Sequence, residues 1–346
     1  MIPHPLVLAV LGCDLGALLL LLYAGWVAAR VVTNWQADAT PEQLRLERQT
    51  EAAGLAGSAA ALLSLLGSLV LVVAFAGALP GLVPGAMCGT GVLQATGGRG
   101  ERALALRLLA LLLLGAWRLV ARLDARTPRA PLVRTAARLL LLAVPVALLA
   151  GLDTWRALAA LDVHTPVDCC AVVYRHAHEA AAAGTQQPAT LRAVPWIVAS
   201  PLAALVLGVA ALAALRRGGE RSARRTGLLA LAALAFAPIA TLALVRVWSA
   251  YHYGVLQHHC PWCLLLATHD LVGYPLFFAI LLVLFEGPTA WLAQRLGERH
   301  AELAAAAAAR TRRATWGTLI GLALYVALAF GPALLWRWRH GVWLHG

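Results

Sequence analysis

Eight long runs of apolar residues constrain the fold of this 346-residue chain more than any other feature. Each run is near or above the roughly 20 residues that an α-helix needs to cross a bilayer. Leucine and alanine dominate the runs, and backbone groups in lipid must be paired within their own segment. We therefore expect an all-α polytopic membrane bundle of about eight transmembrane helices. The runs are approximately 5–29, 55–79, 103–121, 137–158, 195–215, 227–248, 263–285 and 315–336.

The composition excludes several other classes of protein. Charged residues make up 13% of the chain, whereas a soluble domain usually has about a quarter. The formal net charge is +12, but the charges lie in short patches between the apolar runs. No basic face interleaved with aromatic residues is present, so nucleic acid is not an expected partner. A soluble enzyme and a disordered chain are excluded too, and membrane lipid is the expected surrounding.

Arginine predicts the orientation of the spans. Most of the 28 basic residues, all arginine, follow the first, third, fifth and seventh runs, in segments 30–48, 118–138, 216–225 and 295–313. Because positively charged loops stay cytoplasmic, these segments are expected inside and both chain termini outside. The segments 34–54 and 295–313 are also expected to be helical, as a surface helix and a cytoplasmic connector.

Five of the six cysteines fall on the predicted outer side or at its membrane edge: Cys88, Cys169, Cys170, Cys260 and Cys263. In a bacterium this side of the inner (plasma) membrane is the oxidising one, where disulfides persist. The sixth, Cys13, lies inside the first run, and the sequence assigns it no role. The one-sided distribution favours thiol–disulfide chemistry on the periplasmic side.

The sharpest motif is Cys260-Pro261-Trp262-Cys263, which is expected to open the seventh transmembrane helix. Two cysteines three residues apart at a helix N-terminus can close a small disulfide, and the free N–H groups there favour a thiolate. Proline suits the first helical turn, and Trp262 is expected to shield the disulfide. At the lipid boundary the pair would be within reach of a quinone.

Two other interpretations of this motif stay open. The pair can be a purely structural disulfide. It can also be half of a metal site, because His252, His258 and His259 supply further ligands and sulfur suits copper(I). The second interpretation predicts a protein that handles copper or haem.

The remaining cysteines have several possible pairings. Cys169 or Cys170, in a polar loop, is expected to exchange with Cys260, and the alternative is a static disulfide to Cys88. Cys88 itself lies in the glycine-rich segment 85–91, where a partner thiol can attack it or where it can hold the loop cysteines in a resting state. Five outer cysteines allow many connectivities.

Ionisable residues inside predicted spans are functional candidates, because burying charge in lipid is costly. His269 is a candidate proton donor to a reduced quinone, and Asp270 is expected to share a helix face with Cys263. Arg246 can stabilise negative charge on sulfur or quinone. The alternative for Arg246 is an ion pair with Asp14 or Asp270.

The order of these features resembles the vitamin K epoxide reductase family over about residues 138–290, under half of the chain. In that family a helix leads to a cysteine-bearing loop, two helices follow, and Cys-x-x-Cys opens the next helix. The segment Val167-Asp168-Cys169-Cys170-Ala171-Val172-Val173 is similar to the family's second loop cysteine. At the position of the family's first loop cysteine this chain has Asp162, and no tyrosine closely follows Cys263.

The resemblance implies a quinone-dependent thiol–disulfide oxidoreductase with ubiquinone or menaquinone as cofactor. Cys169 or Cys88 would replace the family's first loop cysteine, so the catalytic candidates are Cys88, Cys169, Cys170, Cys260 and Cys263. The resemblance implies that Cys170 is the shuttle thiol, Cys260 its partner and Cys263 the thiol that faces the quinone. The quinone-binding candidates are His269, Asp270, Arg246 and Trp262, and no bound metal is expected. The partner would be a separate periplasmic thioredoxin-like protein, and electron flow outward, as a thiol-reducing conduit, is the alternative direction.

This interpretation divides the chain into an N-terminal three-helix region of unknown role at 1–136, a reductase-like four-helix bundle at 137–290, and a connector with the last helix at 291–346. A second pattern, in the spacing of the cysteines, suggests a different division of the chain. The steps from Cys88 to Cys169 and from Cys170 to Cys260 each span two apolar runs, as a duplicated bundle would give.

Overall fold

The computed structural model describes residues 4–36, 40–127, 129–167, 189–216, 222–255 and 258–344. Within these ranges the chain is helical with no strand, and eight helices are long and apolar enough to cross a membrane. The prediction of an all-α polytopic bundle is therefore confirmed. The chain divides into two compact units, residues 1–167 and 168–346.

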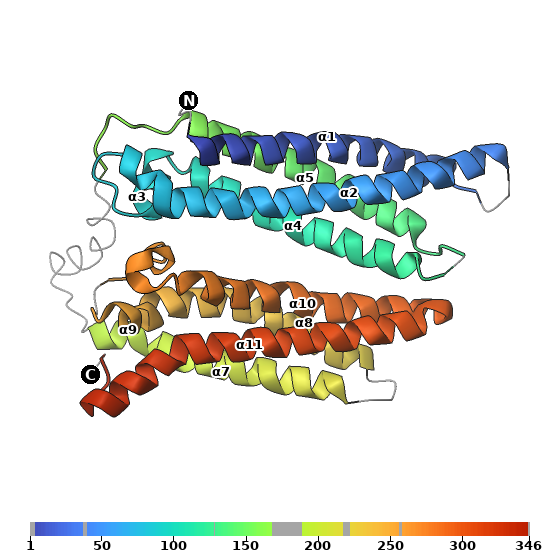
Figure 1. Cartoon of the computed structure of the whole chain (residues 1–346). Helices are drawn as coiled ribbons and strands as arrows, with labels where there is room; N and C mark the ends of the chain where they lie inside the picture. The colour runs from blue at the N-terminus through green and yellow to red at the C-terminus, as the bar shows by residue number, and fades with distance from the viewer. Residues whose placement is uncertain are drawn as a thin grey trace. The chain divides into compact units, whose positions relative to one another are not determined.

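The first unit is a bundle of four long helices (Figure 1). Its helix α1 packs on α2 and α5, and α4 packs on α5 and, less extensively, on α2. The short helix α3 precedes α4. The bounds are α1 Pro5–Asn34, α2 Pro41–Val73, α3 Gly89–Ala95, α4 Arg99–Asp124 and α5 Val133–Ala159.

The second unit is also a bundle of four long helices. Its helix α10 packs on α8 and α11, and α7 packs on α8 and, less extensively, on α11. The bounds are α7 Ala189–Leu215, α8 Ser222–Ala243, α9 Ser249–Tyr253, α10 Gly273–Arg299 and α11 Ala304–His340.

The two units repeat one plan. In each, the second long helix runs directly into a π-helix, Ala74–Ala78 after α2 and Leu244–Trp248 after α8. A cysteine-bearing segment then leads to the third long helix. This common order is the one that a duplicated bundle predicts.

The observed units differ from the division expected from the sequence. The expected boundary at 136–137 falls between α4 and α5, which pack on each other in the first unit. The expected boundary at 290–291 falls within α10, which packs along α11. Each expected boundary therefore falls inside one of the two observed units.

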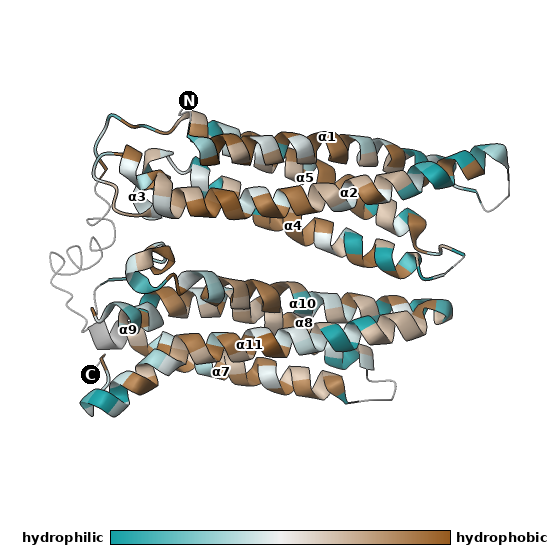
Figure 2. Cartoon of the chain, viewed as in Figure 1, coloured by the Kyte–Doolittle hydropathy of each residue, from teal (hydrophilic) through white to brown (hydrophobic). Residues whose placement is uncertain are grey.

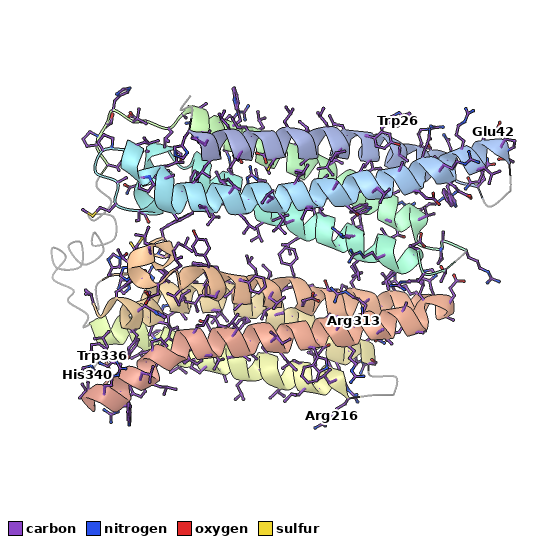
Figure 3. The ribbon with its side chains drawn as sticks, in the orientation of Figure 1. Trp26, Glu42, Arg216, Arg313, Trp336 and His340 are labelled. Atoms are coloured by element: carbon purple, nitrogen blue, oxygen red, sulfur yellow. The ribbon has the colours of Figure 1, made fainter. Side chains whose placement is uncertain are left out.

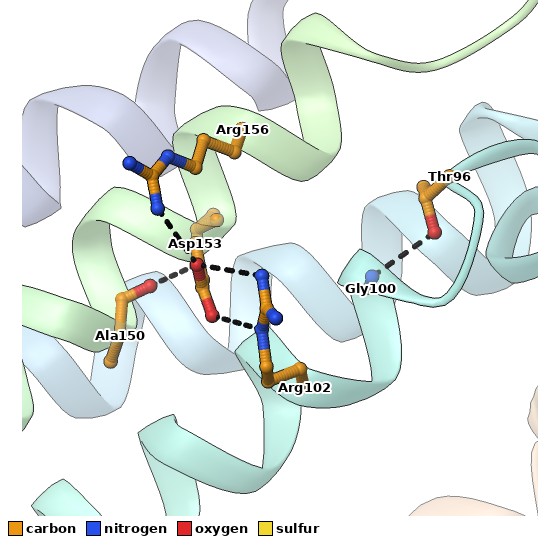
Figure 4. Close-up of polar contacts among 7 residues, drawn as sticks. Thr96, Gly100, Arg102, Ala150, Asp153 and Arg156 are labelled. Carbon is orange, nitrogen blue, oxygen red and sulfur yellow. Dashed lines mark hydrogen bonds and ion pairs between the residues drawn. The ribbon is translucent and has the colours of Figure 1, made fainter.

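Local signals explain where several helices begin. Pro41 occupies the first turn of α2, and the side chain of Thr40 accepts a hydrogen bond from the backbone N–H of Gln43 (3.2 Å). This start makes segment 41–54 part of one continuous helix with the second span instead of a separate surface helix. Similarly, the Thr96 hydroxyl accepts from the backbone N–H of Gly100 (3.0 Å) in the first turn of α4 (Figure 4).

An ion-pair cluster ties the N-terminal part of α4 to α5. The guanidinium of Arg102 donates two hydrogen bonds to the carboxylate of Asp153, at 2.5 and 3.2 Å (Figure 4). Arg156 approaches the same carboxylate at 3.7 Å. Both arginines are largely exposed, so the cluster fixes the relative position of the helices more than it adds stability.

Polar residues lie at the ends of the long helices. In each unit the middle parts of the helices are mostly hydrophobic, and hydrophilic residues gather toward the ends (Figure 2). In the second unit Arg216 and Arg313 lie at one end, and Trp336 and His340 lie at the other (Figure 3). In the first unit Arg134 donates to the Trp35 carbonyl (2.7 Å), which joins two of the arginine-rich segments. The four arginine-rich segments singled out in the sequence therefore lie in pairs, each pair at one end of its own unit.

Candidate functional site

Cys88 lies in the first unit at the end opposite the arginine-rich loops. The chain leaves α2 through the π-helix, makes a 3-10 turn at Pro80–Leu82 and reaches Cys88 just before α3. The side chain of Cys88 is buried, at 1% exposure. Attack by a partner thiol therefore requires the segment to open.

The segment that leads to the loop cysteines lies along the Cys88 segment. The backbone N–H of Val167 donates to the Pro84 carbonyl (2.9 Å), and that of Asp162 donates to the Ala95 carbonyl (3.2 Å). Gly85 has a left-handed backbone (φ 76°), and a Cβ there would lie 2.2 Å from the Val167 carbonyl oxygen. This approach requires glycine. The predicted catalytic residues Cys169 and Cys170 follow Val167 but lie outside the described residues.

Asp162 occupies the position where the resembled family has its first loop cysteine. Its carboxylate accepts hydrogen bonds from the backbone N–H groups of His164 (2.8 Å) and Thr165 (3.1 Å). These bonds, with one from the Thr165 side chain as the strongest influence, lower the pKa of Asp162 to about 2. The residue shapes a turn before Val167 and is charged at neutral pH.

In the second unit Cys260 and Cys263 form a close, buried pair. Their sulfur atoms lie within 4.8 Å of each other, and their side chains are 2% and 9% exposed. The segment follows α9 at the end of the unit opposite Arg216 and Arg313. The pairing predicted from the Cys-Pro-Trp-Cys spacing thus has a geometric basis.

The pair does not open a transmembrane helix, and that prediction is wrong. Cys263 begins a 3-10 turn that ends at Leu265, a second turn spans Ala267–His269, and α10 begins only at Gly273. The hydropathy of Leu264 to Leu266 gave no sign of this, because apolar residues can pack in a compact turn as well as in a span. The pair is therefore not placed by the N-terminus of a long helix.

The same segment corrects the expected position of Asp270. Asp270 and Leu271 both have left-handed backbones (φ 55°), which interrupt any helix between Cys263 and α10. Asp270 is exposed and does not share a helix face with Cys263. Two consecutive non-glycine residues in this region are unusual, and such strain concentrates at functional sites.

Gly273 lets this compact segment pack directly on α10. A Cβ on Gly273 would lie 2.8 Å from the backbone carbonyl carbon of Leu264 and 2.9 Å from its Cβ. Because Leu264 is fully buried one residue after Cys263, the close approach fixes the position of the cysteine pair.

Tyr253, which the sequence analysis did not single out, holds the other side of the pair. Its hydroxyl donates to the backbone carbonyl of Cys260 (2.5 Å). Its ring meets the imidazoles of His258 and His269 edge to face, with centroids 4.4 and 4.6 Å away. The sequence did not indicate this contact. Tyr253 precedes Cys260 by seven residues, and the path of the loop between them brings the two together.

The predicted quinone-binding residues differ in how far they are buried. Trp262 is half-buried between the two cysteines in the sequence, and His269 is half-buried against Tyr253. Burial lowers the pKa of His269, nearby His258 lowers it further, and Asp270 acts in the opposite direction. Arg246 is exposed on the π-helix that follows α8.

Two of the three histidines proposed as metal ligands contact backbone carbonyls. Nε2 of His252 donates to the Leu328 carbonyl and Nδ1 of His259 to the Val245 carbonyl, both at 3.1 Å. Among the described residues, no group of three or more closely spaced metal-ligating side chains includes a histidine. A site that combines these histidines with the two cysteines is therefore not seen in the described part of the chain.

The partner of Asp14 within the first unit is a residue that the sequence did not suggest. Its carboxylate accepts a hydrogen bond from Arg107 of α4. Arg107 lies within the third apolar run, and a charged residue at such a position was the signal that could have identified it.

Comparisons with known proteins place this chain in no family. No family model, curated protein or solved structure matches it.

Proposed function

We propose that the chain is a membrane thiol–disulfide oxidoreductase that transfers electrons from protein thiols to a quinone. The observation that carries the proposal is the buried pair of Cys260 and Cys263, whose sulfur atoms lie within 4.8 Å of each other. Oxidation of the pair to a disulfide would bring the two sulfur atoms to about 2.05 Å. Tyr253 and Gly273 hold the segment from its two sides.

The electron path follows thiol–disulfide exchange. A dithiol of a separate thioredoxin-like protein reduces a disulfide of the loop cysteines, Cys169 and Cys170 with Cys88 as a further partner. The resulting loop thiols reduce the Cys260–Cys263 disulfide by a second exchange through thiolates. The contacts of Val167 and Asp162 with the Cys88 segment support a role for Cys88, since Cys169 follows Val167 by only two residues.

The last step is a two-electron transfer to ubiquinone or menaquinone. The Cys260–Cys263 dithiol loses two electrons and two protons and forms an S–S bond, and the quinone takes up both electrons and both protons as quinol. His269 is assigned to proton exchange, because its imidazole lies in the same compact segment and its lowered pKa keeps it neutral at pH 7. Trp262 limits the access of water to the pair.

The proposed location is the bacterial inner membrane, with the cysteines on the periplasmic side. The arginine-rich loops collect at the opposite end of each unit, and such loops are retained in the cytoplasm. The oxidising periplasm would then keep the resting pair as a disulfide.

The test uses the purified full-length chain in lipid nanodiscs with dithiothreitol as the thiol donor and decylubiquinone as the acceptor. Replacing Cys260 or Cys263 with alanine should abolish thiol-dependent loss of quinone absorbance. Cys13→Ala, in α1, is the matched control and should retain turnover. Unaltered turnover in both the Cys260 and the Cys263 variant would falsify the proposed function.

A further inference from the structure

The first unit contains a cavity of about 500 Å³, and none of the residues that line it is a cysteine. Its walls come from all four long helices of the unit, and most of the lining side chains are leucine or alanine. Leu15 of α1 and Leu149 of α5 line it and are 59% and 51% exposed, so the cavity reaches the apolar surface of the unit. Its volume lies within the range of about 300–1,000 Å³ that is typical of small-molecule sites.

Polar groups converge on one part of this cavity. Arg107, at 5% exposure, lines it together with Asp14, Ser64 and Ser68. The guanidinium of Arg107 donates from Nε to the Thr154 hydroxyl (2.9 Å), from Nη1 to Ser68 (3.4 Å) and from Nη2 to Asp14. An arginine has five N–H groups. Among the described residues three of them have partners, which leaves two for an acceptor inside the cavity.

The charge of this polar end selects among possible ligands. Asp14 neutralises Arg107, so the pair adds no net charge to a region enclosed by apolar side chains. An anionic head group would leave one negative charge uncompensated in that environment, which is strongly unfavourable. A neutral oxygen acceptor satisfies the remaining N–H groups without that cost.

We propose that this cavity binds a neutral lipid-soluble molecule that presents a carbonyl oxygen to Arg107 and packs its hydrocarbon part against the leucine and alanine side chains. Quinones belong to this chemical class. The inference nevertheless goes beyond the proposed function, because no cysteine is among the residues that line the cavity.

The test measures binding of decylubiquinone to the full-length chain in nanodiscs by quenching of tryptophan fluorescence. Trp155 lines the cavity, so its fluorescence should be quenched as the ligand saturates the wild type. This saturable component of the quenching should be lost in Trp155→Phe. Gly151 also lines the cavity, and a Cβ there meets nothing within 4 Å. Gly151→Leu therefore fills the space without a backbone clash and should weaken binding by about tenfold or more.

Gly12→Leu is the matched control. A Cβ at Gly12 also meets nothing within 4 Å, and Gly12 does not line the cavity, so binding should be unchanged. Both variants replace glycine in a helix by leucine, and thermal unfolding of both should show that the bundle is intact. Equal affinity of Gly151→Leu and the wild type would overturn the proposal.

Competition tests the charge argument. Dioleoylglycerol, which is neutral and has ester carbonyls, should displace decylubiquinone, and oleate, which is anionic, should not. Displacement by oleate as effective as that by dioleoylglycerol would overturn the assignment of a neutral ligand. The binding assay does not depend on Cys260 or Cys263, so failure of the proposed function would leave its outcome unaffected, and loss of binding in Gly151→Leu would stand by itself.

Discussion

The hydroxyl of Tyr253 donates a 2.5 Å hydrogen bond to the backbone carbonyl of Cys260, so the last residue of α9 holds the first cysteine of the buried pair. Its ring also packs on His258 and His269, which lie on either side of that pair in the sequence. One side chain thus contacts three residues of a segment that contains short 3-10 turns but no α-helix or strand. The arrangement explains how two cysteines outside a long helix keep a defined geometry.

Replacing Tyr253 with phenylalanine should loosen this segment while keeping the ring contacts. Loss of the hydrogen bond leaves the Cys260 carbonyl without this donor and should destabilise the second unit by about 1 kcal/mol. The rate at which reduced Cys260 reacts with a maleimide should increase. Tyr325→Phe is the matched control, because its hydroxyl donates to the Ala240 carbonyl (3.0 Å) in the core of the same unit. It should lower stability without changing the maleimide rate, and equal rates in the two variants would contradict the positioning role of Tyr253.

Gly273→Ala should displace the turn that carries Cys263. The added Cβ would meet the backbone of Leu264, which cannot rotate away as a flexible side chain can. Overpacking of this kind costs about 1–3 kcal/mol, so thermal unfolding should shift to lower temperature. The reaction of Cys263 with iodoacetamide should also become faster. Gly331→Ala in α11 meets nothing within 4 Å and serves as the control; a similar change in both variants would refute the close-packing argument.

For the ion pair of Asp14 and Arg107, removing one charge should destabilise the protein more than removing both charges. Arg107→Met leaves a carboxylate without its cation and should destabilise the first unit by about 3 kcal/mol or more. The double variant Asp14→Leu with Arg107→Met removes both charges and should recover most of that loss. Unfolding in mixed micelles with increasing sodium dodecyl sulfate measures both. Additive losses in the double variant would show that the two side chains do not stabilise each other.

The pKa of His269 should respond in opposite directions to its two charged neighbours. In the wild type the pKa lies below the ordinary value of 6.5, mainly because of burial. His258→Gln should raise it, and Asp270→Asn should lower it further. Following the imidazole resonances by NMR during a pH titration gives each midpoint directly, and a common direction of change in the two variants would contradict the arrangement.

The lowered pKa of His269 also has a consequence for stability. Protonation favours the unfolded state, because its pKa there is higher, so the contribution of His269 is complete above pH 6.5. It is lost as the pH falls from 6.5 through the folded-state pKa. The unfolding temperature of the wild type should therefore decrease more than that of His269→Gln over this acidic interval.

The two ends of α11 should label from opposite sides of the membrane. Arg313 and Trp338 are separated by 25 residues, which corresponds to about 38 Å along a helix and exceeds the hydrocarbon thickness. In a cysteine-free background, Trp338→Cys should react with an impermeant maleimide in intact cells, since Trp338 is 81% exposed. Arg313→Cys should react only after permeabilisation. The reverse pattern would place the cysteine-bearing ends of the units in the cytoplasm.

The sequence by itself determined the membrane class, the eight spans and the ends of the units at which Cys88 and the pair of Cys260 and Cys263 lie. These follow from composition along the chain, since hydrophobic length and arginine position act segment by segment. It also identified Cys260 and Cys263 as a pair, because three residues of spacing keep two cysteines close in any compact turn. The sequence did not predict the π-helices. It also placed the start of α10 too early, because the apolar residues Leu264 to Leu266 extend the hydrophobic run toward Cys263.

Only the tertiary structure decided how the helices group and which distant residues meet. In the first unit α5 packs on α1 and α4, and in the second α11 packs on α10. The sequence does not predict these pairs, because any apolar helix face can pack against any other. The contacts of Tyr253 with Cys260 and of Arg107 with Asp14 arise from the same packing. Hydropathy is summed within a segment, whereas these contacts depend on the rotation and register of one segment against another, and that information lies in the packed core.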